Sequence, residues 1–207
     1  MRLAPITLVA ALAALPAMAT TEEPAFETVK RSGDFEVRRY APMIVAETLV
    51  DGGLASASNE GFRVIAGYIF GNNLSAKGTG SEKVAMTAPV TTEPVSEKIA
   101  MTAPVTVEPA GERLRMHFVM PARYTMATLP RPLDARVTLR EVPARTVAVL
   151  KFSGFAGEEK VRDKTGELLA WAKAEGLTTA GTPQLARYDP PWTLPFLRRN
   201  EVMVAVP

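Results

Sequence analysis

Two similar halves follow each other along the chain, and this internal repeat limits the possible folds more than any other feature of the sequence. The run at 35–40 resembles the run at 137–142, which gives an offset of 102 residues. Both runs alternate apolar and polar residues, the period of a half-buried β-strand. A second run rich in β-branched residues follows each of them, at 43–50 and 145–152. We therefore predict one β-hairpin in each half.

A helical pattern follows each predicted hairpin. In the second half it runs from Val161 to Ala172 and stops at Gly176, after the basic Lys173. Final strands are predicted at 113–120 and 201–206. We expect an α+β fold in which two pseudo-symmetric β-hairpin-plus-helix units place two helices against a curved antiparallel sheet, leaving a cleft suited to an apolar ligand. The first-half helix carries residues at spacings of three and four: Leu54, Ser58, Gly61, Phe62, Ile65 and Ile69.

Residues 1–19 have the pattern of a secretory signal peptide: Arg2, a short Ala/Leu-rich stretch, then Ala17-Met18-Ala19. The apolar stretch is shorter than the roughly 20 residues that a membrane-spanning helix needs. We therefore expect cleavage, a short linker at 20–25 and a single domain at 26–207. The mature protein would be periplasmic or secreted, and it would have no membrane anchor.

A tandem duplication lies inside the first half. The sequence at 83–91 recurs at 98–106, an offset of 15 residues, which indicates a local duplication of one strand and turn. Met86 and Met101 occupy the same position in the two copies, each before Thr-Ala-Pro. Methionine usually fills cores, but its flexible and polarizable thioether also lines apolar pockets.

The composition excludes several kinds of chemistry. The chain has no cysteine, so thiolate nucleophiles, cysteine-ligated metals and disulfides are excluded. Its 24 basic and 22 acidic residues nearly balance and are not massed as a nucleic-acid-binding protein would require. No serine lies in a nucleophile elbow, and no tight acidic cluster suggests a metal site. We expect a protein that is not an enzyme and does not bind nucleic acid.

The only histidine, His117, lies in the predicted strand at 113–120. Alternation places it on the same face as Arg113 and Arg115, which favours a solvent-facing side chain. The other interpretation is an axial metal ligand or a general base, because the chain offers no other imidazole. The pairs at 38–39 and 198–199 are both Arg-Arg and are expected in solvent, unless one arginine holds a ligand carboxylate at a pocket mouth.

The pair of Lys-(Val/Ile)-Ala-Met-Thr-Ala-Pro-Val runs resembles the SOUL/haem-binding protein family. The resemblance extends from about residue 25 to residue 206 and suggests an exported, bacterial-type member. It implies two similar halves that form a distorted antiparallel β-barrel flanked by two helices. The other matching blocks follow the family order: Phe-Glu-Val-Arg-Arg-Tyr at 35–40, Gly-Tyr-Ile-Phe-Gly-Asn at 67–72, Leu-Pro-Arg-Pro at 129–132, Tyr-Asp-Pro-Pro at 188–191 and Arg-Arg-Asn-Glu-Val at 198–202.

The resemblance also implies a shallow hydrophobic groove between one face of the first helix and the segment that begins at Trp192. Haem-binding relatives carry basic residues near the propionates; Gly67 and Thr193 stand near those positions here, and Arg63 is the candidate substitute. We include both repeated methionines because thioethers line apolar pockets. The predicted ligand-contacting residues are Phe62, Arg63, Ile65, Ala66, Ile69, Met86, Met101 and Trp192.

The resulting hypothesis is non-catalytic, non-covalent binding of haem or another tetrapyrrole by an exported carrier or scavenger. One alternative is a general binder of planar amphipathic small molecules. Another is an envelope protein-interaction module whose groove accepts the apolar side chains of an unknown partner.

Overall fold

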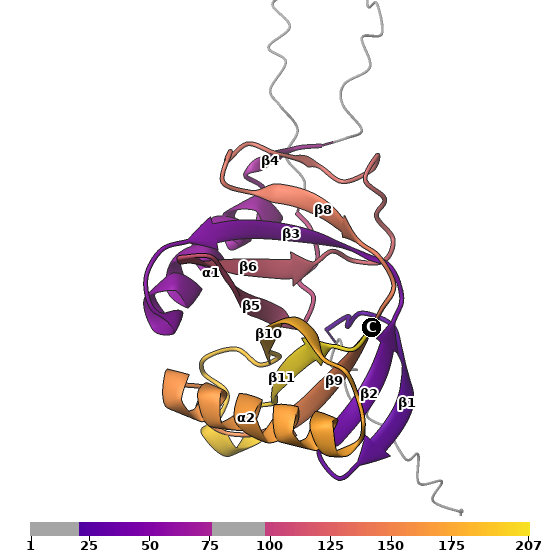
Figure 1. The fold of residues 1–207 in the computed structure, drawn as a ribbon. Coiled ribbons are helices and arrows are strands. Elements are labelled where there is room, and N and C mark those ends of the chain that lie inside the picture. The colour runs from indigo at the N-terminus through magenta and orange to yellow at the C-terminus, as the bar shows by residue number, and fades with distance from the viewer. Residues whose placement is uncertain (1–20, 76–97) are drawn as a thin grey trace, which may run out of the picture.

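The computed structural model describes residues 21–75 and 98–207 (Figure 1). No helix in these two ranges is both long and apolar enough to cross a membrane. Residues 83–91, with Met86, and the predicted signal peptide lie outside the described residues. The elements follow in this order: β1 (Phe26–Ser32), β2 (Phe35–Tyr40), β3 (Met43–Val50), α1 (Leu54–Ile69), β4 (Asn73–Leu74), β5 (Val105–Ala110), β6 (Arg113–Val119), β7 (Arg131–Pro132), β8 (Thr138–Val142), β9 (Arg145–Phe152), α2 (Glu158–Ala174), β10 (Ala180–Arg187), the short 3-10 helix η1 (Pro195–Leu197) and β11 (Asn200–Ala205).

A large antiparallel sheet and two helices make up the fold, as the α+β prediction requires. The strand order in the sheet is β1-β2-β9-β11-β10-β5-β6-β3-β8, and β4 and β7 form a separate small pair. Helix α1 packs on β3 and β6, and α2 packs on β9 and β11 (Figure 1). We call α1 with β5, β6, β3 and β8 the α1 lobe, and α2 with β1, β2, β9, β11 and β10 the α2 lobe. The edge strands β1 and β8 do not pair with each other within the described chain. The expected closed barrel is therefore not found.

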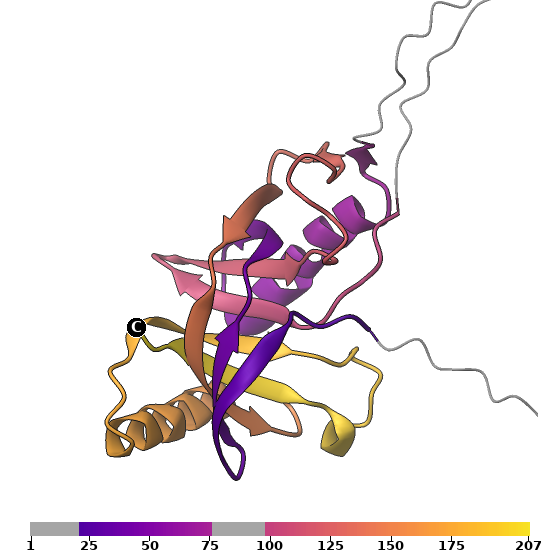
Figure 2. The same cartoon turned by 90° about the vertical axis from the view of Figure 1, so that its right-hand side faces the viewer.

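The two predicted hairpins are wrong. Strand β2 pairs with β9 instead of β3, and β8 pairs with β3 instead of β9. Each two-residue connection contains a proline, Pro42 or Pro143, whose ring fixes φ near −65°. The favoured two-residue hairpin turns need positive φ, which proline cannot adopt and alanine avoids. The chain therefore passes from one lobe to the other at both places. The first half supplies β2 to the α2 lobe, and the second half supplies β8 to the α1 lobe (Figure 2).

Both helices form where the apolar spacing predicts them, and each buries one stripe against the sheet. Helix α1 buries Ile65 and Ile69 in a core that includes Met116 and Phe118 of β6. Gly61 allows this close approach, because a Cβ atom there would lie 2.9 Å from Sδ of Met116. Helix α2 buries a shorter stripe against β9, β10 and β11: Leu168 and Ala172.

The opposite face of the sheet buries charged side chains. Arg38 on β2 is 0 % exposed, and its Nη1 and Nη2 donate to the two carboxylate oxygens of Glu201 on β11 (2.8 and 2.9 Å). Its Nε donates to Oε2 of Glu36 (2.7 Å). The next residue, Arg39, points the other way and pairs with Glu27 in solvent (3.1 Å). The expectation that both arginines are solvated is therefore wrong for Arg38, because alternate residues of a strand face opposite sides.

The two adjacent arginines allow a matched test of this buried pair. We expect Arg38→Met to lower the free energy of unfolding by about 3–5 kcal/mol, because it removes the buried guanidinium that Glu36 and Glu201 share. The control Arg39→Met removes only a solvent-exposed pair and should cost less than about 1 kcal/mol. Urea unfolding of both variants measures the difference. Equal losses would contradict a dominant role for the buried pair.

Candidate functional site

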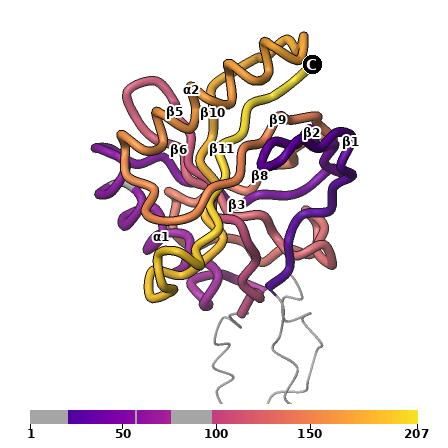
Figure 3. Tube along the Cα trace, turned by 90° about the horizontal axis from the view of Figure 1, so that it is seen from below, coloured from indigo at the N-terminus to yellow at the C-terminus, as the bar shows by residue number. Residues whose placement is uncertain are grey.

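Segments from both halves of the chain meet beside helix α1. In the view from below, the connection between β10 and β11 overlaps α1 (Figure 3). Arg187, at the end of β10, joins them: its Nη1 donates to Oγ of Ser58 on α1 (3.1 Å), and its Nη2 donates to the carbonyl oxygen of Ala156 (3.0 Å). The Gly154 N–H donates to the carbonyl oxygen of Pro195 (2.9 Å). These bonds hold the 153–157 and 188–199 segments together near the N-terminal half of α1.

These two segments expose an unusual amount of apolar surface. Trp192 is 83 % exposed and Phe196 is 70 % exposed. Soluble proteins rarely leave several large apolar side chains in solvent without a binding role. We call the following residues the loop apolar set: Phe155, Trp192, Leu194, Phe196 and Leu197.

Positive charge accompanies the loop apolar set. Burial and the nearby charge of Arg198 lower the pKa of Arg187. The guanidinium of Arg198 lies 5.1 Å from the ring centroid of Phe155, and its Nε donates to the carbonyl oxygen of Thr193 (2.7 Å). Within the described chain, neither arginine forms an ion pair with a carboxylate. An anionic group bound here would favour the charged form of both side chains.

The structure separates the predicted α1 residues into surface and core. Phe62 is exposed and its ring centroid lies 5.8 Å from that of Phe118, while Arg63 is exposed and Ala66 is half-buried. Ile65 and Ile69, in contrast, are almost completely buried beneath the helix. Their side chains pack between α1 and the sheet, so they cannot contact a ligand on the surface of the helix. The prediction placed the exposed and the buried residues of α1 in one groove, because sequence spacing does not say which apolar residues the sheet covers.

The remaining predicted ligand contacts lie at different places. Trp192 belongs to the loop apolar set, whereas Met101 is exposed near the other end of α1, where the Ile99 N–H donates to the Ile69 carbonyl oxygen (2.9 Å). Sequence reasoning missed Arg187, Phe155 and three residues near Trp192. The missed signal is the run at 192–197, which holds four large apolar residues without helical or strand periodicity. Without such periodicity, these residues do not form one apolar face that could pack against the core.

His117 does not face solvent, which makes that expectation wrong. It is 4 % exposed on β6, directly opposite Glu47 of β3 and Thr106 of β5. Burial lowers its pKa to about 3, and the charges of Arg145 and Arg140 contribute to this shift. Its Nδ1 has no hydrogen-bond partner among the described residues. Met116 and Phe118 face α1, so the imidazole lies on the opposite face of β6 from this helix.

A cluster of metal ligands is not found in the described part of the chain: no three His, Asp or Glu side chains there form a group that could hold a metal ion.

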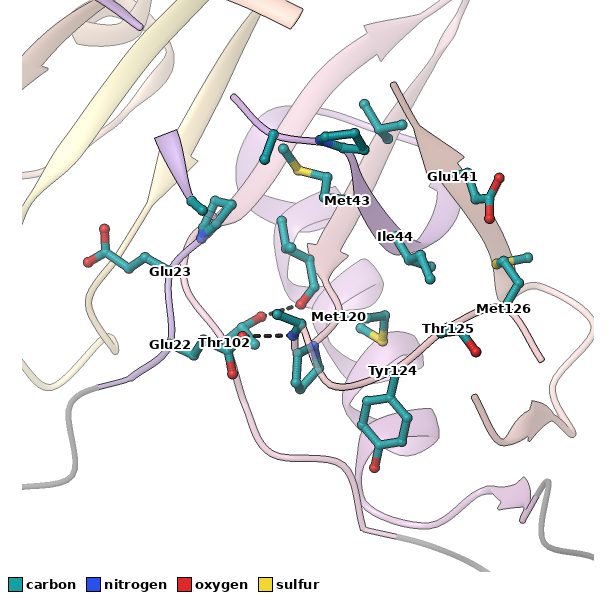
Figure 4. Close-up of a pocket in the computed structure, with 18 of the residues that line it drawn as sticks. Glu22, Glu23, Met43, Ile44, Thr102, Met120, Tyr124, Thr125, Met126 and Glu141 are labelled. Atoms are coloured by element: carbon teal, nitrogen blue, oxygen red, sulfur yellow. Dashed lines mark hydrogen bonds between the residues drawn. The ribbon is translucent and has the colours of Figure 1, made fainter. Parts of the chain in front are cut away.

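A cavity of about 910 Å³ lies on another part of the α1 lobe (Figure 4). Its apolar lining includes Met43, Ile44 and Met120, and three carboxylates stand at its edge. The charge of this cavity is therefore opposite to that beside the loop apolar set. The acidic lining residues are Glu22, Glu23 and Glu141.

The buried imidazole gives a prediction for stability against pH. The pKa of His117 is about 3 in the folded state and about 6.5 in the unfolded state. Between these pH values the imidazole is protonated in the unfolded chain and neutral in the folded chain. Stability from this residue is present above pH 6.5 and is lost as the pH falls toward 3. Between pH 7 and 5 the wild type should lose about 2 kcal/mol more than His117→Gln. Urea unfolding at both pH values measures it, and identical pH dependence would contradict a neutral buried His117.

Comparison with known proteins gives one family and one fold. A model of the SOUL heme-binding protein family matches residues 21–205. The fold is similar to that of the C-terminal domain of EcmrR (TM-score 0.56, 12% identity, 84% of this chain and 96% of that chain). It is also similar to an uncharacterized conserved protein from Listeria innocua (TM-score 0.55, 11% identity, 84% of this chain and 92% of that chain). No curated protein matches the sequence. Because the family match covers nearly the whole described chain, this protein belongs to the SOUL heme-binding protein family.

Proposed function

We propose that this protein binds haem or another carboxylate-bearing tetrapyrrole, without catalysis, on the surface between α1 and the β10–β11 connection. Family membership supports the class of ligand. One observation carries the choice of site: Arg187 and Arg198 have no carboxylate partner in the described chain and adjoin the exposed loop apolar set. A tetrapyrrole offers the complement of both features, an apolar ring face and acidic side groups.

The proposed affinity comes from burial of the ring and from the arginines. Apolar burial contributes about 25 cal/mol per Å², so each 100 Å² of ring face covered is worth about 2.5 kcal/mol. Arginine adds a fork of donors that matches a carboxylate. The chain contains no cysteine, and its one histidine is buried on the far face of β6. Met101 lies near the other end of α1. We therefore expect burial of the ring to contribute more than iron ligation.

We expect the protein to bind hemin and metal-free protoporphyrin with one-to-one saturation and with affinities within about tenfold of each other, because ring burial dominates over iron ligation. Absorbance changes and quenching of Trp192 fluorescence measure both titrations, with Trp192→Phe assigning the quenched signal. Spectra that rise linearly without saturation for both compounds would overturn the proposal. Strong selectivity for hemin would contradict only the dominance of ring burial.

Charge removal tests the site. We expect Arg187→Gln and Arg198→Gln each to weaken hemin binding about tenfold, the equivalent of about 1.4 kcal/mol, because each removes a donor for a propionate. The control Arg162→Gln removes the same charge from the exposed face of α2 and should leave the affinity unchanged. Circular dichroism checks the fold of each variant. Equal affinities in all four proteins would refute this location.

The proposed cellular role is that of an exported carrier or scavenger, supported by the signal-peptide pattern at 1–19. We expect the protein recovered from outside the cytoplasm to begin at Thr20, as the sequence Ala17-Met18-Ala19 predicts. Mass spectrometry of fractionated cells measures this. An intact N-terminus in the cytoplasmic fraction would contradict export without affecting ligand binding.

A further inference from the structure

We propose that the 910 Å³ cavity of the α1 lobe is a second ligand site, which takes a small amphipathic organic cation. This site is separate from the surface proposed for tetrapyrroles, and the inference does not depend on that function. It rests on three observations: the size of the cavity, the way its walls are held, and the sign of the charge around it.

The size and lining suit an organic molecule. Ligand pockets usually measure about 300–1,000 Å³ and are mostly apolar, with a few polar groups that orient the ligand. Met43 and Ile44 of β3 form one wall, and Met120 and Tyr124 from the segment after β6 lie below them (Figure 4). Met126 also lines the cavity. Thioether side chains adapt their shape to flat or branched hydrocarbon, so this lining does not demand one ligand outline.

Backbone hydrogen bonds hold the N-terminal wall in place. Residues 22–25, expected from the sequence to be a linker, lie along the cavity. The Ala103 N–H donates to the Glu22 carbonyl oxygen (2.9 Å), and the Ala41 N–H donates to the Ala25 carbonyl oxygen (3.0 Å). The carboxylate Oε1 of Glu22 accepts from the Ala122 N–H (2.7 Å). The cavity is therefore built before any ligand arrives, which lowers the entropy cost of binding.

Charge selects the class of ligand. The described lining contains three carboxylates and no basic side chain. Glu23 is neutralised by Arg199 (2.7 Å), whereas Glu22 accepts a neutral backbone amide and forms no ion pair within the described chain. Glu141 is exposed, and no ion pair within the described chain involves it. Two carboxylates thus remain to attract a cation, and they would repel the propionates of haem.

Nearby basic residues do not reverse this balance. Arg199 also approaches Glu201, so its charge is shared between two carboxylates. Arg123 lies outside the lining and stacks its guanidinium on the ring of Tyr124, 4.7 Å from the centroid. A ligand with an apolar body and one delocalised or quaternary ammonium charge therefore complements the cavity.

Two dyes with the same xanthene core test the sign of the charge. We expect the cation rhodamine 6G to bind saturably, as measured by fluorescence anisotropy, and the dianion fluorescein to bind at least tenfold more weakly. Glu141→Gln should weaken rhodamine 6G about fivefold. The control Glu159→Gln removes the same charge from the first turn of α2 and should change nothing. Equal binding of the two dyes, or equal effects of the two variants, would overturn the inference.

A second pair of variants locates the dye. Ala122 lines the cavity through an exposed side chain, so its replacement need not disturb the core. Ala122→Arg should weaken rhodamine 6G at least fivefold, while Ala122→Glu, of comparable length, should not weaken it. Saturating hemin should leave the affinity for rhodamine 6G unchanged. Competition between the two ligands would instead place the dye on the tetrapyrrole surface and refute a second site.

Discussion

The buried bond between Arg38 and Glu201 is the interaction on which the arrangement of the sheet depends. It joins β2, near the start of the chain, to β11, its last strand, across the intervening β9. Burial alone would lower the pKa of Arg38, but the carboxylate of Glu201 more than reverses this and keeps the guanidinium charged. The Tyr188 hydroxyl donates to the same carboxylate (2.6 Å), and Glu36 accepts from both Arg38 and Lys151 (2.7 Å each). A shift of β2 by one residue would move Arg38 to the other face of the sheet and take away the two-pronged partner of Glu201.

The pairing of β10 with β5 joins the two lobes and explains why the proposed tetrapyrrole surface draws on distant segments. Helix α1 comes from the first half, and the β10–β11 connection comes from the second, yet Arg187 bonds directly to Ser58. The lower lobe in Figure 1 therefore supplies Arg187, which bonds to a helix of the upper lobe. Separately, the two Pro-containing connections meet the N-terminal segment at the methionine-lined cavity. One fold thus presents a basic apolar surface and an acidic apolar cavity, which suit ligands of opposite charge.

Local patterns predicted the elements well and their partners poorly. The spacing of Leu54, Ile65 and Ile69 correctly predicted α1, because helix periodicity depends only on which residues must be buried. The hairpins failed because strand alternation contains no information about the partner strand, although Pro42 was a signal against a tight turn. His117 was misplaced because alternation separates two faces without saying that the sheet buries both. Of the predicted groove residues, Phe62, Arg63 and Trp192 are exposed, whereas Ile65 and Ile69 lie in the core.

The sequence by itself determined the family, the α+β class, the two helices and the scarcity of histidine and cysteine, because these follow from motif order, periodicity and composition. Only the tertiary structure decided which arginines are buried, which apolar residues remain exposed and which charges lack partners. Arg38 and Arg39 illustrate the difference: they are identical neighbours in the sequence, yet one is an interior cation and the other a solvated one. Burial and charge pairing depend on segments more than 100 residues apart, and no local pattern encodes the distance between them.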